Sequence, residues 1–119
     1  MQRFTDLEAW KNGLLLVQEV YSITQTFPRE EIYGMTAQLR RSSTSILANI
    51  AEGSGRFTYP DKAAKYVISR GESSETEALL LIAVALKFVT EEKIHQALQC
   101  IHRERALLSG LIAACRKRS

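Results

Sequence analysis

Three carboxylates in one predicted helix, Glu72, Glu75 and Glu77, are the side chains best placed for chemistry in this sequence. Neighbouring carboxylates can transfer protons or hold a metal ion. Helical bundles that bind two iron ions take a Glu-x-x-His pair from each of two helices. The sequence has this pattern once, at Glu92 and His95, so we do not predict a metal site.

The other candidate nucleophiles and ligands match no known catalytic pattern. His95 and His102 lie seven residues apart, and Cys100 between them does not complete a zinc-site spacing. The sequence has no Gly-x-Ser-x-Gly elbow and no phosphate-binding loop. We therefore predict a protein that is not an enzyme and that uses no cofactor.

The cysteine spacing and the hydropathy indicate where the chain works. Cys100 and Cys115 fall in one predicted helix, where their separation of roughly 22 Å rules out a disulfide. No apolar run approaches the length of about 18 residues that a membrane span needs, and no export signal begins the sequence. The sequence predicts a cytoplasmic protein with no membrane partner.

The composition favours one helical domain over residues 1–119. The 45% hydrophobic and 24% charged residues are typical of globular proteins. Two prolines and six glycines are too few for the frequent turns of an all-β fold.

Apolar residues recur at steps of three and four and predict helices over about residues 6–26, 31–53, 60–89 and 91–117. Thr5 and Glu8 match a capping box at the start of the first helix. Gly71, inside the third, costs about 1 kcal/mol relative to alanine, so we expect a tight contact there. Short connections favour an all-α, up-down-up-down antiparallel four-helix bundle.

Antiparallel pairing predicts a polar network between the helices. Arg41 falls level with Glu72, and Gln38 falls level with Glu75. Glu75 also falls level with Arg105, and Glu77 with Arg103. Because an unpaired buried carboxylate is costly, we expect Arg41 and Arg105 to neutralise Glu72, Glu75 and Glu77, and the network to specify the helix register. The predicted network contains Gln38, Arg41, Asn49, Glu52, Glu72, Glu75, Glu77 and Arg105.

The formal charge of +3 comes from 16 basic and 13 acidic residues and is concentrated late in the chain. Residues 1–102 hold 11 basic and 12 acidic residues, whereas residues 103–119 hold five basic residues and one acidic. Such a cluster can bind a phosphate backbone, although basic residues also complement the C-terminal pole of a helix. The candidate nucleic-acid-binding residues are Arg40, Arg56, Lys62, Lys65, Arg116, Lys117 and Arg118.

The first predicted helix carries two apolar stripes, while the core of one bundle needs only one stripe per helix. The second stripe predicts contact with a neighbouring protomer in a closed ring, or with the chain termini. The candidate interface residues are Leu15, Leu16, Val20 and Ile23, with aromatic help from Tyr59.

Several motifs resemble a known family. They are Phe4, Leu7, Trp10, Tyr21, Phe27-Pro28, Glu30, Glu31, Tyr33, Gly34, Gln38 to Arg41, Ser45-Ile46, Asn49 to Gly53, Arg56, Arg70-Gly71, Glu75 and Glu77. The sequence resembles the bacterial four-helix-bundle proteins encoded in ribosomal RNA intervening sequences. The resemblance covers about residues 4–90 and is most specific over residues 38–53. It departs at Glu72, where family members often have a small neutral residue.

That family is similar in turn to the accessory variability determinant protein of diversity-generating retroelements, a basic homopentamer that binds nucleic acid and a reverse transcriptase. The resemblance implies a homopentameric ring and a reverse transcriptase as a possible partner. Two hypotheses follow. The protein is a nucleic-acid-binding accessory protein that contacts the phosphates of RNA or DNA, or it is a protein-interaction scaffold with no direct nucleic-acid binding.

Overall fold

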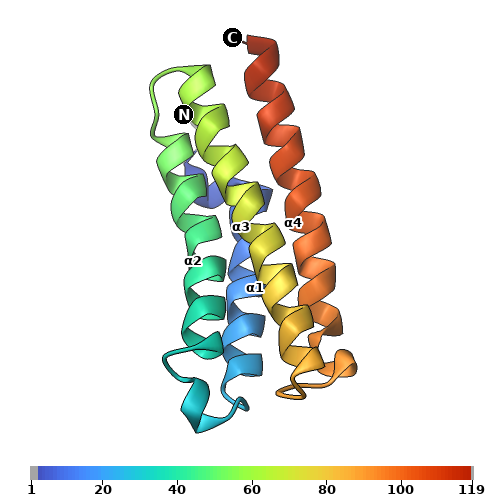
Figure 1. Ribbon diagram of the computed structural model, residues 1–119. Helices are drawn as coiled ribbons and strands as arrows, with labels where there is room; N and C mark the ends of the chain where they lie inside the picture. The colour runs from blue at the N-terminus through green and yellow to red at the C-terminus, as the bar shows by residue number, and fades with distance from the viewer. Residues whose placement is uncertain (1–2, 119) are drawn as a thin grey trace.

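A computed structural model of the chain describes residues 3–118 as four packed helices (Figure 1). They are α1 (Glu8–Thr24), α2 (Met35–Ser54), α3 (Tyr59–Ala85) and α4 (Glu91–Arg118), with short 3-10 turns η1 (Phe4–Asp6) and η2 (Arg29–Glu31). Each helix packs antiparallel to the next, and α4 packs against α1 to close the bundle. The predicted helical bundle is confirmed. None of the helices described is long and apolar enough to cross a membrane.

The start of α1 differs from the predicted capping box. Thr5 and Asp6 belong to the 3-10 turn η1, and Leu7, in an extended conformation, precedes the first helical residue. The Asp6 carboxylate accepts a hydrogen bond from the backbone N–H of Arg3 at 3.3 Å. The capping box at Thr5 and Glu8 is therefore wrong, because the chain uses a separate turn to enter the helix.

The helix α3 ends earlier than predicted through a turn that needs no glycine. The backbone N–H groups of Lys87 and Phe88 donate to the carbonyls of Val84 and Ala83, both at 2.9 Å. With these two hydrogen bonds closing the helix, Lys87 adopts the left-handed backbone conformation, at φ 64°. The turn directs Phe88 back to the core, where its ring lies 5.7 Å from that of Phe27.

Most residues of the second apolar stripe of α1 are buried in the core of the bundle. Leu16 and Val20 are fully buried and Ile23 is almost so, because α1 packs against both α2 and α4. The prediction that these three residues contact another protomer is wrong, since the bundle itself covers them. Leu15 and Tyr59 remain exposed.

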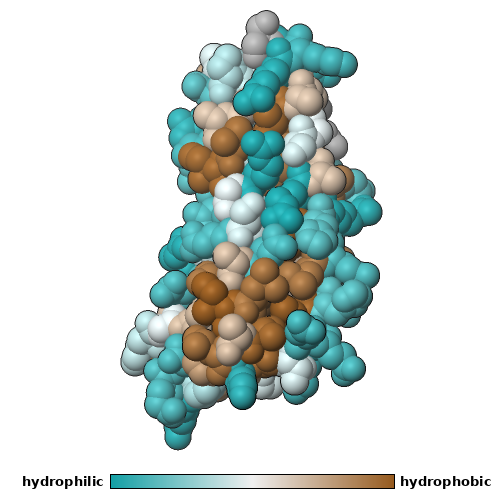
Figure 2. All heavy atoms as spheres, turned by 45° about the vertical axis from the view of Figure 1, so that its right-hand side comes forward, coloured by the Kyte–Doolittle hydropathy of each residue, from teal (hydrophilic) through white to brown (hydrophobic). Residues whose placement is uncertain are grey.

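The helix α3 has more exposed large apolar residues than the other described helices. Its exposed large apolar residues are Tyr59, Val67, Ile68, Leu81 and Ile82, and the exposed Leu86 follows directly after its last residue. Figure 2, which brings α4 forward, shows a continuous apolar area in its lower half, at the end where α3 stops and α4 begins. This exposed area is available for a contact outside the bundle.

Small residues bring α2 and α3 close together. Ser42, Ser69 and Thr76 are fully buried between them. The hydroxyls of Ser42 and Thr76 lie 2.8 Å apart, and Ser69 donates to the carbonyl of Ile46 at 2.8 Å. At Gly53 an added Cβ would lie 2.7 Å from Cε1 of Tyr66. Close packing of the two helices therefore requires glycine at position 53.

Gly71 has no such role. An added Cβ there would meet nothing within 4 Å, and the residue lies on the exposed side of α3. The tight contact expected at Gly71 is wrong for the single chain, because this part of α3 faces away from the bundle.

The two glycines form a matched pair for a stability test. We predict that Gly53→Ala lowers the free energy of unfolding by about 1–3 kcal/mol, because the Tyr66 ring must shift. Gly71→Ala should raise it by up to about 1 kcal/mol through helix propensity alone. Urea unfolding followed by circular dichroism measures both, and equal effects of the two substitutions would contradict this account of the packing.

Candidate functional site

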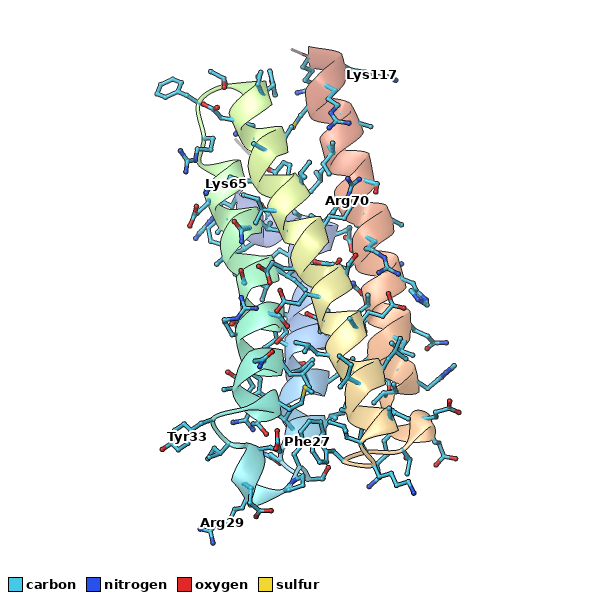
Figure 3. All side chains as sticks on the ribbon, in the orientation of Figure 1. Phe27, Arg29, Tyr33, Lys65, Arg70 and Lys117 are labelled. Carbon is cyan, nitrogen blue, oxygen red and sulfur yellow. The ribbon has the colours of Figure 1, made fainter. Side chains whose placement is uncertain are left out.

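Basic residues gather at the end of the bundle where α2 and α4 finish and α3 begins. Lys65 on α3 and Lys117 on α4 lie toward this end, while Arg29 and Tyr33 lie at the other (Figure 3). Residues 52–65 and 116–118 hold six basic and two acidic side chains. We call this set, Arg56, Lys62, Lys65, Arg116, Lys117 and Arg118, the basic end.

One carboxylate at the basic end is shared by two of its cations. Glu52 lies 2.8 Å from Nζ of Lys65 and 3.8 Å from a guanidinium nitrogen of Arg56. The hydrogen bond from Lys65, supported by its charge and that of Arg56, lowers the pKa of Glu52. Two positive charges thus meet one negative charge here.

Two further cations are positioned by neutral groups. Lys62 donates from Nζ to the carbonyl of Ser54 at 2.8 Å, at the last turn of α2. Arg118 donates to the hydroxyl of Tyr59 at 3.3 Å, and its guanidinium carbon lies 5.7 Å from the centre of that ring. Neither contact neutralises the cation, so both keep their charge available to a ligand.

Arg40 does not join the basic end. It lies in α2, 16 residues before Arg56, or about 24 Å along a helix. Its Nε donates to the Thr24 hydroxyl at 2.9 Å, and its guanidinium carbon lies 4.5 Å from the centre of the Tyr21 ring. The structure brings together six of the seven predicted nucleic-acid-binding residues and leaves Arg40 with a role in packing α1 against α2.

At the opposite end of the bundle, acidic side chains slightly outnumber basic ones. Its connecting segments, residues 29–31 and 87–93, hold four acidic and three basic side chains. Charge is therefore separated along the 46 Å length of the molecule.

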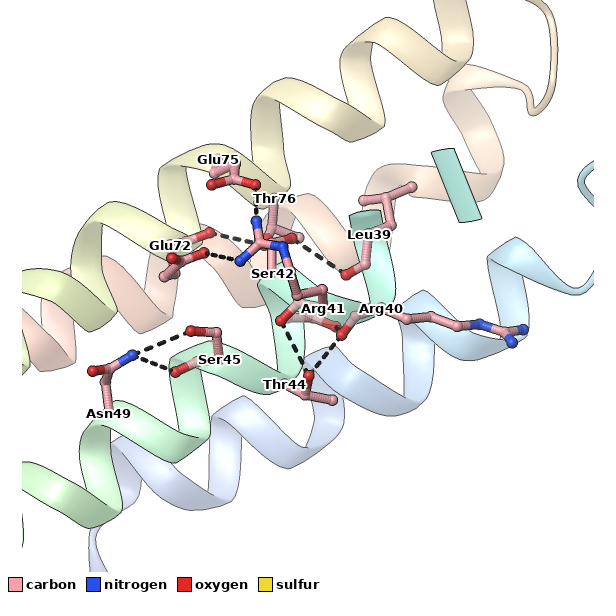
Figure 4. A network of polar contacts seen from close by, with 11 residues as sticks. Leu39, Arg40, Arg41, Ser42, Thr44, Ser45, Asn49, Glu72, Glu75 and Thr76 are labelled. Carbon is pink, nitrogen blue, oxygen red and sulfur yellow. Dashed lines mark hydrogen bonds and ion pairs between the residues drawn. The ribbon is translucent and has the colours of Figure 1, made fainter. Parts of the chain in front are cut away.

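The predicted polar network forms in part, on the outside of the α2–α3 seam (Figure 4). Arg41 lies 3.5 Å from Glu72 and also pairs with Glu75. Beneath them, Thr76 donates to the carbonyl of Glu72 at 2.9 Å. The Arg41 side chain is more than half exposed, so the network is partly solvated and adds little stability.

Other members of the predicted network pair differently. Arg105 contacts Glu77 at 2.5 Å, one of the carboxylates predicted for the network, while Glu75 pairs with Arg41. Arg103 lies 3.9 Å from Glu8 on α1 instead of contacting Glu77. The hydrogen bond from Arg105 is the main cause that lowers the pKa of Glu77. Arg105 also donates to the hydroxyl of Ser74, beside Glu75, at 3.4 Å, and His102 contacts Glu77 at 3.4 Å, so α3 and α4 face each other at the predicted level.

Two amides predicted in the network stay out of it. Asn49 donates to the carbonyl and hydroxyl of Ser45 within α2, at 2.9 and 3.2 Å. Gln38 is exposed and does not pair with Glu75, whose partner is Arg41. Their placement in an interhelical network is wrong, since both side chains point away from the seam or along their own helix.

The most buried charged residue of the described chain, Glu104 on α4, lies outside the predicted network. One of its oxygens accepts a hydrogen bond from Nδ2 of Asn12 at 2.8 Å, and Asn12 also donates to the carbonyl of Cys100 at 2.9 Å. The other oxygen has no hydrogen-bond partner among the described residues. Burial is the main cause that raises the pKa of Glu104 to about 7, against smaller opposing effects of Asn12 and Arg103.

Gly13 provides the room for this carboxyl group. An added Cβ at Gly13 would lie 2.9 Å from the Glu104 oxygen and 2.6 Å from Leu47. The sequence contains a signal for this site, because Glu104 falls between Ile101 and Leu108 on the apolar stripe of α4. A polar residue at a core position, with glycine on a neighbouring helix, indicates a buried polar contact.

Residues 3–118 contain no cluster of three or more histidine, cysteine, aspartate or glutamate side chains that could hold a metal ion. Glu104 and the surface ion pairs are thus separate features and not parts of one ligand set.

A comparison with known protein families shows to which family the chain is related. The model of the 23S rRNA-intervening sequence protein family matches residues 5–110. The chain belongs to this family. The match extends through α4 almost to its last two turns, beyond the part of the chain in which the motifs were recognised.

A solved structure supports the same architecture. It is a protein of unknown function from the S23 ribosomal protein family of Bacteroides thetaiotaomicron, at 24% identity and a TM-score of 0.80. The alignment covers 88% of this chain and 95% of that one. At this identity the likeness shows the fold alone. No curated protein matches the sequence.

The buried Glu104 predicts a distinctive pH dependence of stability. Because its pKa rises from 4.5 to about 7 on folding, the folded state holds the proton more tightly than the unfolded state. The contribution of Glu104 to the free energy of unfolding should fall by about 3 kcal/mol between pH 4.5 and 7 and stay level above pH 7. Glu104→Gln should abolish this fall and be more stable than the wild type at pH 8.

Chemical unfolding of both proteins at a series of pH values measures the difference, with Glu30→Gln on the exposed turn η2 as the control. A pH profile of Glu104→Gln that matches the wild type would show that Glu104 has an ordinary pKa.

Proposed function

We propose that this protein binds nucleic acid without catalysis, through phosphate contacts at the basic end, and works as a homo-oligomer. The observation that carries the proposal is the separation of charge along the bundle. Six cations gather at one end, in segments 52–65 and 116–118, whose acidic residues are Glu52 and Asp61. A concentrated patch of this kind attracts a polyanion even though the whole chain carries only +3.

The helix poles do not account for this charge. A helix N-terminus carries about half a positive charge and a C-terminus about half a negative one. At the basic end the C-termini of α2 and α4 meet the N-terminus of α3, and the N-terminus of α1 points the same way. The four poles roughly cancel, so the excess of basic side chains is left for a partner.

The exposed face of α3 supports the homo-oligomer. Leu81 and Ile82 near its end, and Leu86 just after it, are each about half exposed, and exposed apolar patches of this kind often mark a contact with another protein. A second copy of the chain is the occupant we propose. The number of copies, a pentamer by resemblance to the retroelement protein, stays a prediction, as does the partnership with a reverse transcriptase.

The same face favours the second candidate, a protein-interaction scaffold. In that case a different protein covers Ile82 and its neighbours, and the basic end only keeps the protein in solution. The two candidates differ in whether the purified protein binds nucleic acid by itself.

The salt dependence of binding tests the first candidate. We predict that a labelled single-stranded RNA binds the wild-type protein with an affinity that falls steeply with salt. The triple variant Arg116→Gln/Lys117→Gln/Arg118→Gln should lower the slope of log affinity against log salt by about 2 for each bound protomer, because three phosphate contacts are lost. Fluorescence anisotropy over a salt series measures the slope.

The matched control is Arg29→Gln/Lys87→Gln/Lys93→Gln, which removes the same charge from the opposite end. It should leave the slope almost unchanged. Equal losses in the two triple variants would show that net charge, and not the basic end, governs binding. No binding even at low salt would reject the first candidate in favour of the scaffold.

A substitution on α3 tests the homo-oligomer. Ile82→Glu places a charge in the exposed apolar face, so we predict that it reduces the solution mass to the 13.4 kDa of one chain. Tyr33→Glu, on the exposed connection before α2, should leave the mass unchanged. Light scattering after size-exclusion chromatography measures the mass. If Leu15→Glu dissociates the protein and Ile82→Glu does not, the contact lies on α1.

A further inference from the structure

A pocket opens at the basic end because α1 begins at Glu8, short of the tip that α3 and α4 reach. The helix α1 has 17 residues, whereas α3 has 27 and α4 has 28. At 1.5 Å per residue, α3 and α4 exceed α1 by about 15 Å. Below this overhang lies a pocket of about 490 Å³, a size typical of small-molecule sites.

The walls of the pocket are aromatic and aliphatic. Tyr59 and Tyr66 line it from α3, Leu7 lies where α1 starts, and Leu111 lies on α4. The ring of Tyr66 is held in place by its close contact with Gly53, so this wall is rigid. Such walls fit a flat ring with apolar faces.

The rim of the pocket is cationic. Lys62 and Arg118 are both among its lining residues, and none of those residues is acidic. The hydrogen bond from Lys62 to Ser54 uses one of three ammonium donors, and the bond from Arg118 to Tyr59 uses one of five guanidinium donors. Both side chains are therefore oriented and keep donors for an anionic group.

We propose that this pocket binds one unpaired nucleotide of a single-stranded nucleic acid, with the base between the aromatic walls and the phosphate at Lys62 and Arg118. The inference rests on the proposed function and names the kind of nucleic acid that the basic end takes. A duplex does not fit, because its bases are paired and stacked and cannot enter a pocket.

A second aromatic side chain is exposed two residues before Tyr59. Phe57, in the turn between α2 and α3, is fully exposed and stands two residues before Tyr59. A fully solvated phenylalanine contributes nothing to the core, whereas an adjacent base can stack on it. The basic end thus offers a second aromatic side chain, close in sequence to Tyr59, on which a neighbouring base can stack.

The test compares strand preference and not only affinity. At one salt concentration, a labelled single strand and the duplex of the same sequence are titrated, each as RNA and as DNA. We expect the wild-type protein to bind the single strands more tightly than the duplexes. Tyr59→Leu should weaken single-strand binding roughly 5- to 150-fold, the loss of one stacked base, and should weaken duplex binding much less, because there it loses only the contact that orients Arg118.

A second variant fills the pocket without changing its charge. Ala114 lines the pocket from the exposed side of α4, so Ala114→Phe should fold normally and block the base. It should lose the same preference for single strands. Tyr33→Leu removes an exposed tyrosine at the opposite end and should have no effect.

The outcomes separate the two levels of the argument. If single strands and duplexes bind equally, and neither Tyr59→Leu nor Ala114→Phe changes this, the pocket proposal is wrong and the basic end binds phosphates alone. If the wild-type protein binds none of the probes at low salt, the proposed function fails as well. Loss of the preference in both variants, with duplex binding retained, supports the pocket.

Discussion

The short length of α1 is the constraint on which the rest of the structure depends. Its 17 residues cover only part of α3 and α4, so the molecule is a four-helix bundle over most of its length and a three-helix assembly at one end. Where α1 is present, the interior is filled by apolar side chains and by the Asn12–Glu104 contact. Where it is absent, Tyr59 and Tyr66 line an open pocket. Leu7, at the point where the chain turns into α1, marks the boundary between the two regions.

The polar groups of the bundle follow this division. In the four-helix part, charged groups pair with each other: Arg41 with Glu72 and Glu75, and Arg105 with Glu77. Such partly exposed pairs add little free energy, but like charges facing each other would oppose a wrong register. At the open end, Lys62 and Arg118 are held by a carbonyl and a hydroxyl, which orient them and leave their charge in place. Lys62 and Arg118 can therefore bind an anionic ligand, whereas the charges of the paired residues are already neutralised.

The sequence was sufficient for the fold and for most of the basic end. Apolar spacing located four helices, and their short connections fixed the antiparallel order that brings Lys62 near Arg118. It was insufficient where tertiary contacts override local patterns. The turn at Lys87 contains no glycine, so the early end of α3 carried no local signal. The sequence alone assigns Val20 to an oligomer interface, because it does not show that α1 packs against both α2 and α4, which together bury two apolar stripes.

The positions of the apolar face and the basic end determine what an oligomer would do. The apolar face of α3 lies along the side of the bundle, while the cations lie at one tip, so contact through α3 leaves the tip uncovered. In a cyclic assembly whose axis runs along the bundles, rotation keeps every tip on the same rim. The charge of each tip then adds to that of its neighbours, and one strand can contact several pockets in succession. An antiparallel pair would place the tips at opposite ends and lose this addition. Parallel association would therefore let copies of modest individual charge bind one strand more strongly than a single chain can.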